Sequence, residues 1–396
     1  MKLMNSFFLV FTFLICSLAQ AQEIKKEFKV NAGGQLDVDS DAGGSISITG
    51  WEKSSISVEI SHDYNVNEID FNFKETANGL VITSRRNGNR NYHNGNLKFV
   101  IKVPSKLDLE LKTSGGTLNI SKVAGDLDGR TSGGSINLNE LSGDINCKTS
   151  GGNISLKSVD GEGDLSTSGG NINIFGLKGE FDFSTSGGNI SISDAEFNGD
   201  ARTSGGNIKV TGTKGKMDLA TSGGNISMSK SEIEGDVRTS GGNISISSAP
   251  NGGSFVTSGG NISISKAGKF IVVKTSGGNI SVKELDGGVE AKTSGGNINI
   301  IMTGDPKVGD RNAELASSGG SITLLVPEGM DMDIDIELEI TRRANKNYKI
   351  ISDFPITKNN DGGTGERTIT GVGKTGSGKN KIKLRTVNGD IYLKKA

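Results

Sequence analysis

The sequence is poor in the residue types that build most catalytic centres and disulfide-bonded scaffolds. Its 396 residues include 2 histidines, 2 cysteines, 5 prolines and 1 tryptophan. So few histidines argue against imidazole-based catalysis and against histidine-ligated zinc. Cys147 is the only cysteine after the N-terminal leader described next, so we expect it to be a small core residue without a disulfide partner.

Long apolar runs are also missing after the first twenty residues. Residues 1–21 have the pattern of a secretory signal peptide: Lys2, an apolar run from Phe7 to Leu18, and Ala19-Gln20-Ala21 as a cleavage site. The bulky Ile15 before Cys16 argues against a lipoprotein. We therefore expect an exported chain, in the periplasm, at the cell surface or outside the cell, whose mature part does not insert into the membrane.

The sequence also has no strong excess of positive or negative charge. The formal net charge is -1 at pH 7, which gives no reason to expect nucleic acid or an anionic membrane as a partner. Aromatic residues make up only 5% of the chain, whereas glycine contributes 59 residues. This composition suits a thin, regular β structure better than a broad globular core.

One motif, Thr185-Ser-Gly-Gly-Asn-Ile-Ser-Ile192, recurs throughout the chain. Eleven copies start 18 residues apart, at positions 113, 131, 149, 167, 185, 203, 221, 239, 257, 275 and 293. A fixed period of this size is typical of a solenoid in which each repeat forms one coil. Parallel strands stack about 4.8 Å apart, so eleven coils predict a rod on the order of 50 Å long.

Within each coil, numbered from its Thr as position 1, two short strands are predicted. Isoleucine at position 6 and an apolar residue at position 8 alternate with Asn, Ser or Lys, the period of a strand with one buried face. A second strand near positions 15–18 has apolar residues at 15 and 17, as in Ile145 and Cys147. We expect the glycines at positions 3 and 4 to adopt positive φ at a sharp corner. The fold class is therefore all-β, a single-stranded parallel β-solenoid (β-helix) with 18-residue coils and irregular capping ends.

The flanking regions carry weaker copies of the same pattern. After the signal peptide (1–21) we expect an N-terminal β region with irregular coils and a cap (22–112), the regular solenoid (113–300), and divergent C-terminal coils with a cap (301–396). Ala42-Gly-Gly-Ser-Ile-Ser-Ile48 is a degenerate copy in the first of these regions. In the last, we predict a strand at Met332–Ile340, a long loop to about Lys379, and a final repeat at Thr386–Leu393 that closes the rod.

The pattern resembles a bacterial domain-of-unknown-function family of β-strand-repeat proteins that are labelled as adhesins. The resemblance rests on the repeated Thr-Ser-Gly-Gly-Asn-Ile-Ser-Ile, on Ser318-Gly-Gly-Ser-Ile-Thr-Leu-Leu-Val-Pro327, and on Arg385-Thr-Val-Asn-Gly-Asp-Ile391. It covers nearly the whole mature chain. It implies an exported β-solenoid without catalytic residues, and some relatives are linked to envelope-stress signalling.

Two rows of polar residues are candidate functional features. An outward row at position 5 could bind glycan, ice or another rod, although we favour a structural hydrogen-bonded ladder; it comprises Asn153, Asn171, Asn189, Asn207, Asn225, Asn243, Asn261, Asn279 and Asn297. A row at position 16 has the carboxylate oxygens that Ca²⁺ prefers, although a solvated face with screened repulsion is the simpler interpretation; it comprises Asp164, Asp182, Asp200, Asp218 and Asp236.

Catalytic interpretations have weaker support. Gly373-Lys-Thr-Gly-Ser-Gly-Lys-Asn380 nearly matches a phosphate-binding loop, but Asn380 replaces the Ser or Thr that would hold magnesium, and a strand pattern follows it. We interpret it as a turn. Short corners leave no walls for a substrate groove, so we predict no enzymatic activity, no cofactor and no catalytic residues; a calcium-dependent polysaccharide-active enzyme is the remote alternative.

The sequence thus predicts a non-enzymatic, adhesin-like structural or binding protein of the bacterial envelope. A surface glycan or an envelope protein is the expected partner. The alternative function is that of an envelope-stress sensor or regulator that binds a membrane signalling partner. Such a regulator would use the non-repetitive ends, where the Arg85–His93 loop and residues 341–380 differ from the coils.

Overall fold

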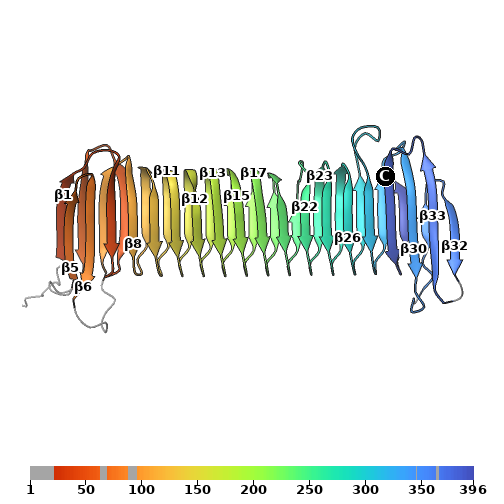
Figure 1. The fold of residues 1–396 in the computed structure, drawn as a ribbon, viewed down its shortest axis with the longest axis horizontal. Helices are drawn as coiled ribbons and strands as arrows, with labels where there is room; N and C mark the ends of the chain where they lie inside the picture. The colour runs from red at the N-terminus through yellow and green to blue at the C-terminus, as the bar shows by residue number, and fades with distance from the viewer. Residues whose placement is uncertain (1–21, 63–68, 88–95, 345, 363–364) are drawn as a thin grey trace, which may run out of the picture.

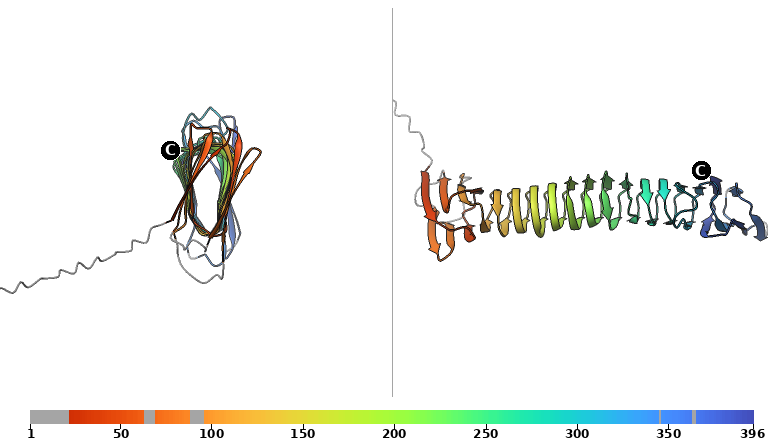
Figure 2. Two further views of the ribbon diagram at one scale, coloured as in Figure 1. Left: turned by 90° about the vertical axis from the view of Figure 1, so that its left-hand side faces the viewer. Right: turned by 90° about the horizontal axis from the view of Figure 1, so that it is seen from above.

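The computed structural model describes all residues except 1–21, 63–68, 88–95, 345 and 363–364. These residues form a long rod of strands that lie side by side across its axis (Figure 1), and the described part contains no helix. Seen along the rod, two sheets face each other and the chain winds around a narrow interior (Figure 2). The predicted β-solenoid is therefore confirmed. The predicted signal peptide and most of the Arg85–His93 loop lie outside the described residues.

One of the two sheets contains the strand that follows each Asn of position 5, and we call it the Asn sheet. Its strands, in spatial order along the rod, are β1 (Gln22–Lys29), β4 (Ser55–His62), β7 (Lys98–Pro104), β3 (Ser45–Trp51), β9 (Leu118–Ala124), the first parts of β11 (Ile136–Thr149), β12 (Ile154–Thr167) and β13 (Ile172–Thr185), then β14 (Ile190–Ser193), β16 (Ile208–Thr211), β18 (Ile226–Ser229), β21 (Ile244–Ile246), β23 (Ile262–Gly268), β25 (Ile280–Asp286), β27 (Ile298–Met302), β29 (Ile322–Val326), β35 (Ile391–Lys395) and β31 (Ile350–Ser352).

The opposite sheet carries the aspartates of position 16, and we call it the Asp sheet. Its strands, in the same direction, are β5 (Ile69–Thr76), β6 (Gly79–Arg86), β2 (Gly34–Ser40), β8 (Leu107–Thr113), β10 (Leu127–Thr131), the last parts of β11, β12 and β13, then β15 (Glu196–Thr203), β17 (Lys214–Thr221), β20 (Asp236–Thr239), β22 (Gly253–Thr257), β24 (Ile271–Thr275), β26 (Val289–Thr293), β28 (Ala313–Ser317), β34 (Asn380–Val387), β30 (Met332–Ile340), β33 (Arg367–Thr375) and β32 (Thr357–Gly362). A short strand, β19 (Glu232–Glu234), pairs with β17 at the corner between the sheets.

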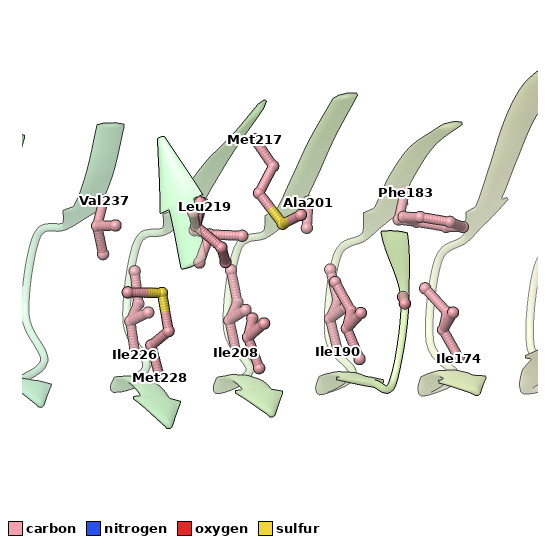
Figure 3. Close-up of a cluster of buried hydrophobic side chains, with 14 of the residues drawn as sticks. Ile174, Phe183, Ile190, Ala201, Ile208, Met217, Leu219, Ile226, Met228 and Val237 are labelled. Carbon is pink, nitrogen blue, oxygen red and sulfur yellow. The ribbon is translucent and has the colours of Figure 1, made fainter. Parts of the chain in front are cut away.

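Strands of successive coils pair in parallel with a register of one coil. Ile154 lies beside Ile172, and Ile190 beside Ile208, so that the position-6 isoleucines form a continuous buried ladder. Figure 3 shows this ladder facing side chains of the Asp sheet across the interior. Each fully buried isoleucine contributes about 1.5–3 kcal/mol of hydrophobic stabilisation, before the entropy cost of ordering the coil.

The corner that begins each motif is closed by threonine and by one of its two glycines. Thr185 is buried, and its Oγ1 donates to the carbonyl of Gly170 at 2.9 Å and accepts from the N–H of Gly188 at 3.2 Å. The expected positive φ is wrong for the regular coils, because none of their motif glycines adopts it. Position 4 requires glycine for another reason: a Cβ on Gly188 would lie 1.9 Å from the Gly170 carbonyl oxygen of the preceding coil.

Positive φ occurs instead at position 10, the corner that follows the Asn-sheet strand. Glu140, Ser158 and Asp194 have φ between 50° and 54°, and Gly176 and Gly212 occupy the same position in other coils. The left-handed conformation costs a non-glycine residue about 1–2 kcal/mol. Positive φ is therefore found at the second corner of each of these coils, and not at the first, where we expected it.

The N-terminal end is not built in chain order. The coil formed by β2 and β3 lies between the β6–β7 coil and the β8–β9 coil, because β2 pairs with both β6 and β8 and β3 with both β7 and β9. The degenerate copy at residues 42–48 is thus a stacked coil, with Ile46 beside Leu118. Strands β1, β4 and β5 complete the end through antiparallel pairs.

The C-terminal end corrects two of our expectations. The last repeat does not close the rod: β34 and β35 lie inside the stack, between β28 and β29 on one side and β30 and β31 on the other. The predicted loop before Lys379 contains β31, β32 and β33. The polarity of the strands explains which of them ends the rod. Strand β34 buries Ile382 and Leu384 inside the stack, whereas the outermost strand β32 is exposed at every residue.

Ser317 begins its copy of the motif 24 residues after Thr293 instead of 18, and one buried cation holds the six extra residues in place. Arg311 is 2% exposed and donates to the carbonyls of Thr303 and Asp305, at 2.7 and 3.1 Å, and to Asp286 Oδ1 at 2.6 Å. Its backbone N–H donates to Asn380 Oδ1 at 3.0 Å. Arg311 therefore joins the insertion to the regular coils through its side chain and to β34 through its backbone N–H, and nothing in the repeat pattern indicated it.

Candidate functional site

The position-5 asparagines form a ladder between side chain and backbone along one edge of the Asn sheet. Asn171 Oδ1 accepts from the backbone N–H of Asn189 at 2.8 Å, and Asn189 Oδ1 accepts from that of Asn207 at 2.7 Å. The same bond continues from Asn207 through Asn279, up to the N–H of Asn297. The side chains are mostly exposed, yet their oxygens are already engaged, so the row is ordered before any ligand arrives.

We expect the triple replacement of Asn225, Asn243 and Asn261 by alanine to lower the free energy of unfolding by about 2 kcal/mol, because three ladder bonds are lost and water partly replaces them. Thermal denaturation followed by circular dichroism measures the change. The control replaces Ser227, Ser245 and Ser263 by alanine; these exposed serines lie on the same face and their side chains make no ladder bond. An equal loss in both triple variants would contradict a ladder role.

The aspartates of position 16 use the same kind of bond. The backbone N–H of Asp200 donates to Asp182 Oδ1 at 2.7 Å, and that of Asp236 donates to Asp218 Oδ1 at 2.8 Å. Arg202 pairs with Asp200 at 2.5 Å, and Arg238 pairs with Asp236. Asp164 lies beside Asp182 in register, and its own N–H donates to Asn146 at 3.2 Å.

A second acidic column, at position 14, runs beside the first and was missed in the sequence. It consists of Asp126, Asp144, Glu162 and Glu180, which line shallow hollows of the Asp sheet together with Asp164 and Asp182. Across the described ranges, no three His, Cys, Asp or Glu residues are grouped closely enough to hold a metal ion. The calcium strip therefore gains no geometric support, and the carboxylates bond to backbone and arginine.

Position 18 carries a column of cations that the sequence analysis did not single out. It borders the corner occupied by the buried threonines, where two grooves of about 470 and 480 Å³ lie near the ends of the rod. The N-terminal groove lies beneath Arg85 of β6, and the C-terminal groove lies beside Glu337 and Glu339 of β30. Each exists because an end strand extends past the corner of the regular coils.

Other features singled out in the sequence have structural roles. Cys147 is buried and unpaired, and burial raises the pKa of its thiol to about 12, so it is not a reactive thiolate. The segment resembling a phosphate loop is the connection from β33 to β34, where Ser377 donates to Asp331 Oδ2 at 2.8 Å. This bond helps hold the pKa of Asp331 below its ordinary value. None of the described segments forms a helix long and apolar enough to cross a membrane.

Comparison with solved structures finds distant likenesses. A "putative cell adhesion protein" from Clostridium sporogenes is 10% identical, with 95% of this chain and 100% of that chain covered and a TM-score of 0.18. From Parabacteroides distasonis, a "putative adhesin" is 15% identical (75% and 98% covered, TM-score 0.30), and a "putative lipid binding protein" is 16% identical (71% and 97% covered, TM-score 0.24). Sequence identities and TM-scores this low support no conclusion about function. No protein of curated function matches the chain.

The sequence profile of one family does match. The profile described as Toastrack DUF4097, a domain of unknown function, covers residues 17–283, more than half of the chain. Two of the segments on which the resemblance rested, 318–327 and 385–391, lie outside this range. The match includes most of the regular coils and the N-terminal β region. This chain therefore belongs to the Toastrack DUF4097 family.

Proposed function

We propose that this protein is an exported, non-enzymatic rod whose Asn sheet is a contact surface for a glycan or a protein of the cell envelope. The proposal rests on the composition and order of the outer face of that sheet. Asn and Ser predominate on it, and its asparagine row is held in one arrangement by the ladder. A pre-ordered polar surface binds with a smaller entropy cost than a flexible one, and a repeating surface gains from several simultaneous contacts.

The two sheets differ in a way that favours the Asn sheet for this role. The outer face of the Asp sheet carries the two carboxylate columns, which would disfavour an anionic cell surface there, away from the corner that holds the position-18 cations. The Asn sheet has hydroxyl and amide groups at most outward positions and, within the described strands, one exposed aromatic ring, Phe175, at 48% exposure. The described residues that line the two corner grooves include no histidine or cysteine, which favours binding over catalysis.

Deleting two internal coils, residues 203–238, tests the proposal. The register of the stack survives because whole coils are removed. We expect the shortened rod to fold and to bind native cells or envelope fragments several-fold more weakly in a pull-down titration, because contacts are lost from the repeating face. A matched control changes only the Asp sheet, by Asp200→Asn, Asp218→Asn and Asp236→Asn, and should bind as the parent protein does.

Unchanged binding by the shortened rod would contradict a role for the coils and favour the alternative function, in which a terminal region binds one signalling partner. Cell fractionation with crosslinking provides the second measurement. Recovery at the outer surface or in the medium, joined to glycan or to other cells, supports the proposal. Recovery only in the cytoplasm would overturn export.

A further inference from the structure

The N-terminal groove is formed where strand β6 extends over the corner of the first coils. Arg85 lies above it and bonds to Asp39 at 2.7 Å, an interaction that lowers the pKa of the Asp39 carboxyl from its ordinary value. Lys112, Arg130 and Lys148 follow along its floor on three neighbouring strands, with Arg130 in register between the two lysines. The lysines are therefore two strand spacings apart, roughly 10 Å.

Lys112 and Lys148 differ from the other position-18 cations in their ion pairs. Along this column, six cations have an ion-pair partner: Arg130, Arg202, Arg238, Lys274, Lys292 and Arg385. Lys112 and Lys148 are exposed and form no ion pair among the described residues. Lys112 lies beside Asp39 in register, and its charge contributes to the lowered pKa of that carboxyl. The two lysines are the only such members of the column in that part of the chain, and both lie in one groove.

In the C-terminal groove, the position-18 cations at the same corner have carboxylate partners. There Lys292 pairs with Glu290 at 3.0 Å and with Glu314 at 2.8 Å, and Lys274 pairs with Glu290 at 2.9 Å. Arg385 lies within 3.6 Å of a carboxylate of β30. The two grooves are similar in volume and both are lined by Thr and Ser, but they differ in two respects. The C-terminal groove also contains Val256, Ala316 and Val387, and its cations are ion-paired, whereas two cations of the N-terminal groove are not.

The rest of the N-terminal lining indicates the kind of ligand. Ser114, Ser132 and Ser150 are exposed along the floor, and the described lining contains no apolar or aromatic side chain. A protein partner would need an apolar anchor, and a single-stranded nucleic acid would need a stacking ring. Hydroxyls beside two free ammonium groups instead suit a polyhydroxylated chain that carries spaced anionic groups.

We propose that the groove between Arg85 and Lys148 binds an acidic polysaccharide, with Lys112 and Lys148 each contacting one carboxylate of the sugar chain and the serine row contacting its hydroxyls. The two carboxylates would be spaced by about two strand spacings. Asp41, which also lines the groove, disfavours a densely charged polymer. This site is separate from the Asn sheet, and the inference stands whether or not that sheet contacts a surface.

Binding of fluorescent oligogalacturonate to the full mature chain, measured by anisotropy in low salt, tests the proposal. We expect the double variant Lys112→Gln, Lys148→Gln to bind roughly tenfold more weakly, the loss expected for two solvent-exposed charge contacts. The matched control is Lys274→Gln, Lys292→Gln in the C-terminal groove, which should bind as the parent protein does. Melting temperatures of both variants establish that each remains folded.

Two further probes separate the ligand classes. Neutral dextran of similar length should not compete with the labelled oligosaccharide, whereas unlabelled oligogalacturonate should. Tighter binding of polyphosphate than of oligogalacturonate would overturn the assignment to a carboxylated sugar. Absence of binding by the parent protein, or equal losses in the N-terminal and C-terminal variants, would overturn the site itself.

Discussion

Replacing Gly188 by alanine should disrupt the rod locally, with a loss of about 3 kcal/mol or more in the free energy of unfolding. The new Cβ would lie 1.9 Å from the carbonyl oxygen and 2.4 Å from the carbonyl carbon of Gly170. Both are backbone atoms whose neighbours are paired in the sheet, so no side-chain rotation relieves the clash. Hydrogen exchange of the two adjoining coils, together with the melting temperature, measures the effect.

The neighbouring Gly187 provides the control. Its Cβ would meet nothing closer than 3.7 Å, an ordinary contact, and its φ lies outside the left-handed region. Gly187→Ala should therefore change stability by less than about 1 kcal/mol, and in the stabilising direction because the unfolded chain loses freedom. Similar losses in the two variants would show that chain flexibility, and not the close approach of two coils, is what position 4 requires.

Replacing Arg311 by methionine should open the insertion that precedes β28 and cost about 3 kcal/mol. The carbonyls of half-buried Thr303 and exposed Asp305 would lose their charged donor, and a hydrogen bond to a charged group contributes about 1.5–3 kcal/mol. Arg311→Lys should recover little, since one ammonium cannot reproduce the planar fork that reaches both carbonyls and Asp286. Faster hydrogen exchange over residues 303–312 and at Asn380 would report the change.

A second arginine–aspartate pair serves as the comparison. Arg130 bonds to Asp128 at 3.0 Å, but the two side chains are 66% and 45% exposed. Arg130→Met should cost less than about 1 kcal/mol because exposed ion pairs contribute little. If Arg311→Met left exchange in the insertion unchanged, the buried cation would not be the group that holds it.

The coil pattern was predictable because its cause is local and repeated. Alternating isoleucines, a constant 18-residue spacing and paired glycines each favour one stacked arrangement, and agreement over eleven copies leaves little room for another. The same repetition predicted that the Asn153–Asn297 row lies on one outward face. It misled us about the glycines, since a motif shows that glycine is needed without showing whether the reason is φ or the approach of the next coil.

The ends and the grooves could not be read in this way, because they depend on contacts between segments far apart in the chain. Arg311 bonds to Asn380, and β2 pairs with β8 although five other strands lie between them in the chain. Whether Lys112 and Lys148 have carboxylate partners also depends on which strands become neighbours. The sequence by itself determined the coil, its period and its buried face; the tertiary structure decided the order of the terminal coils and where free charge remains, because only long-range pairing places those groups together.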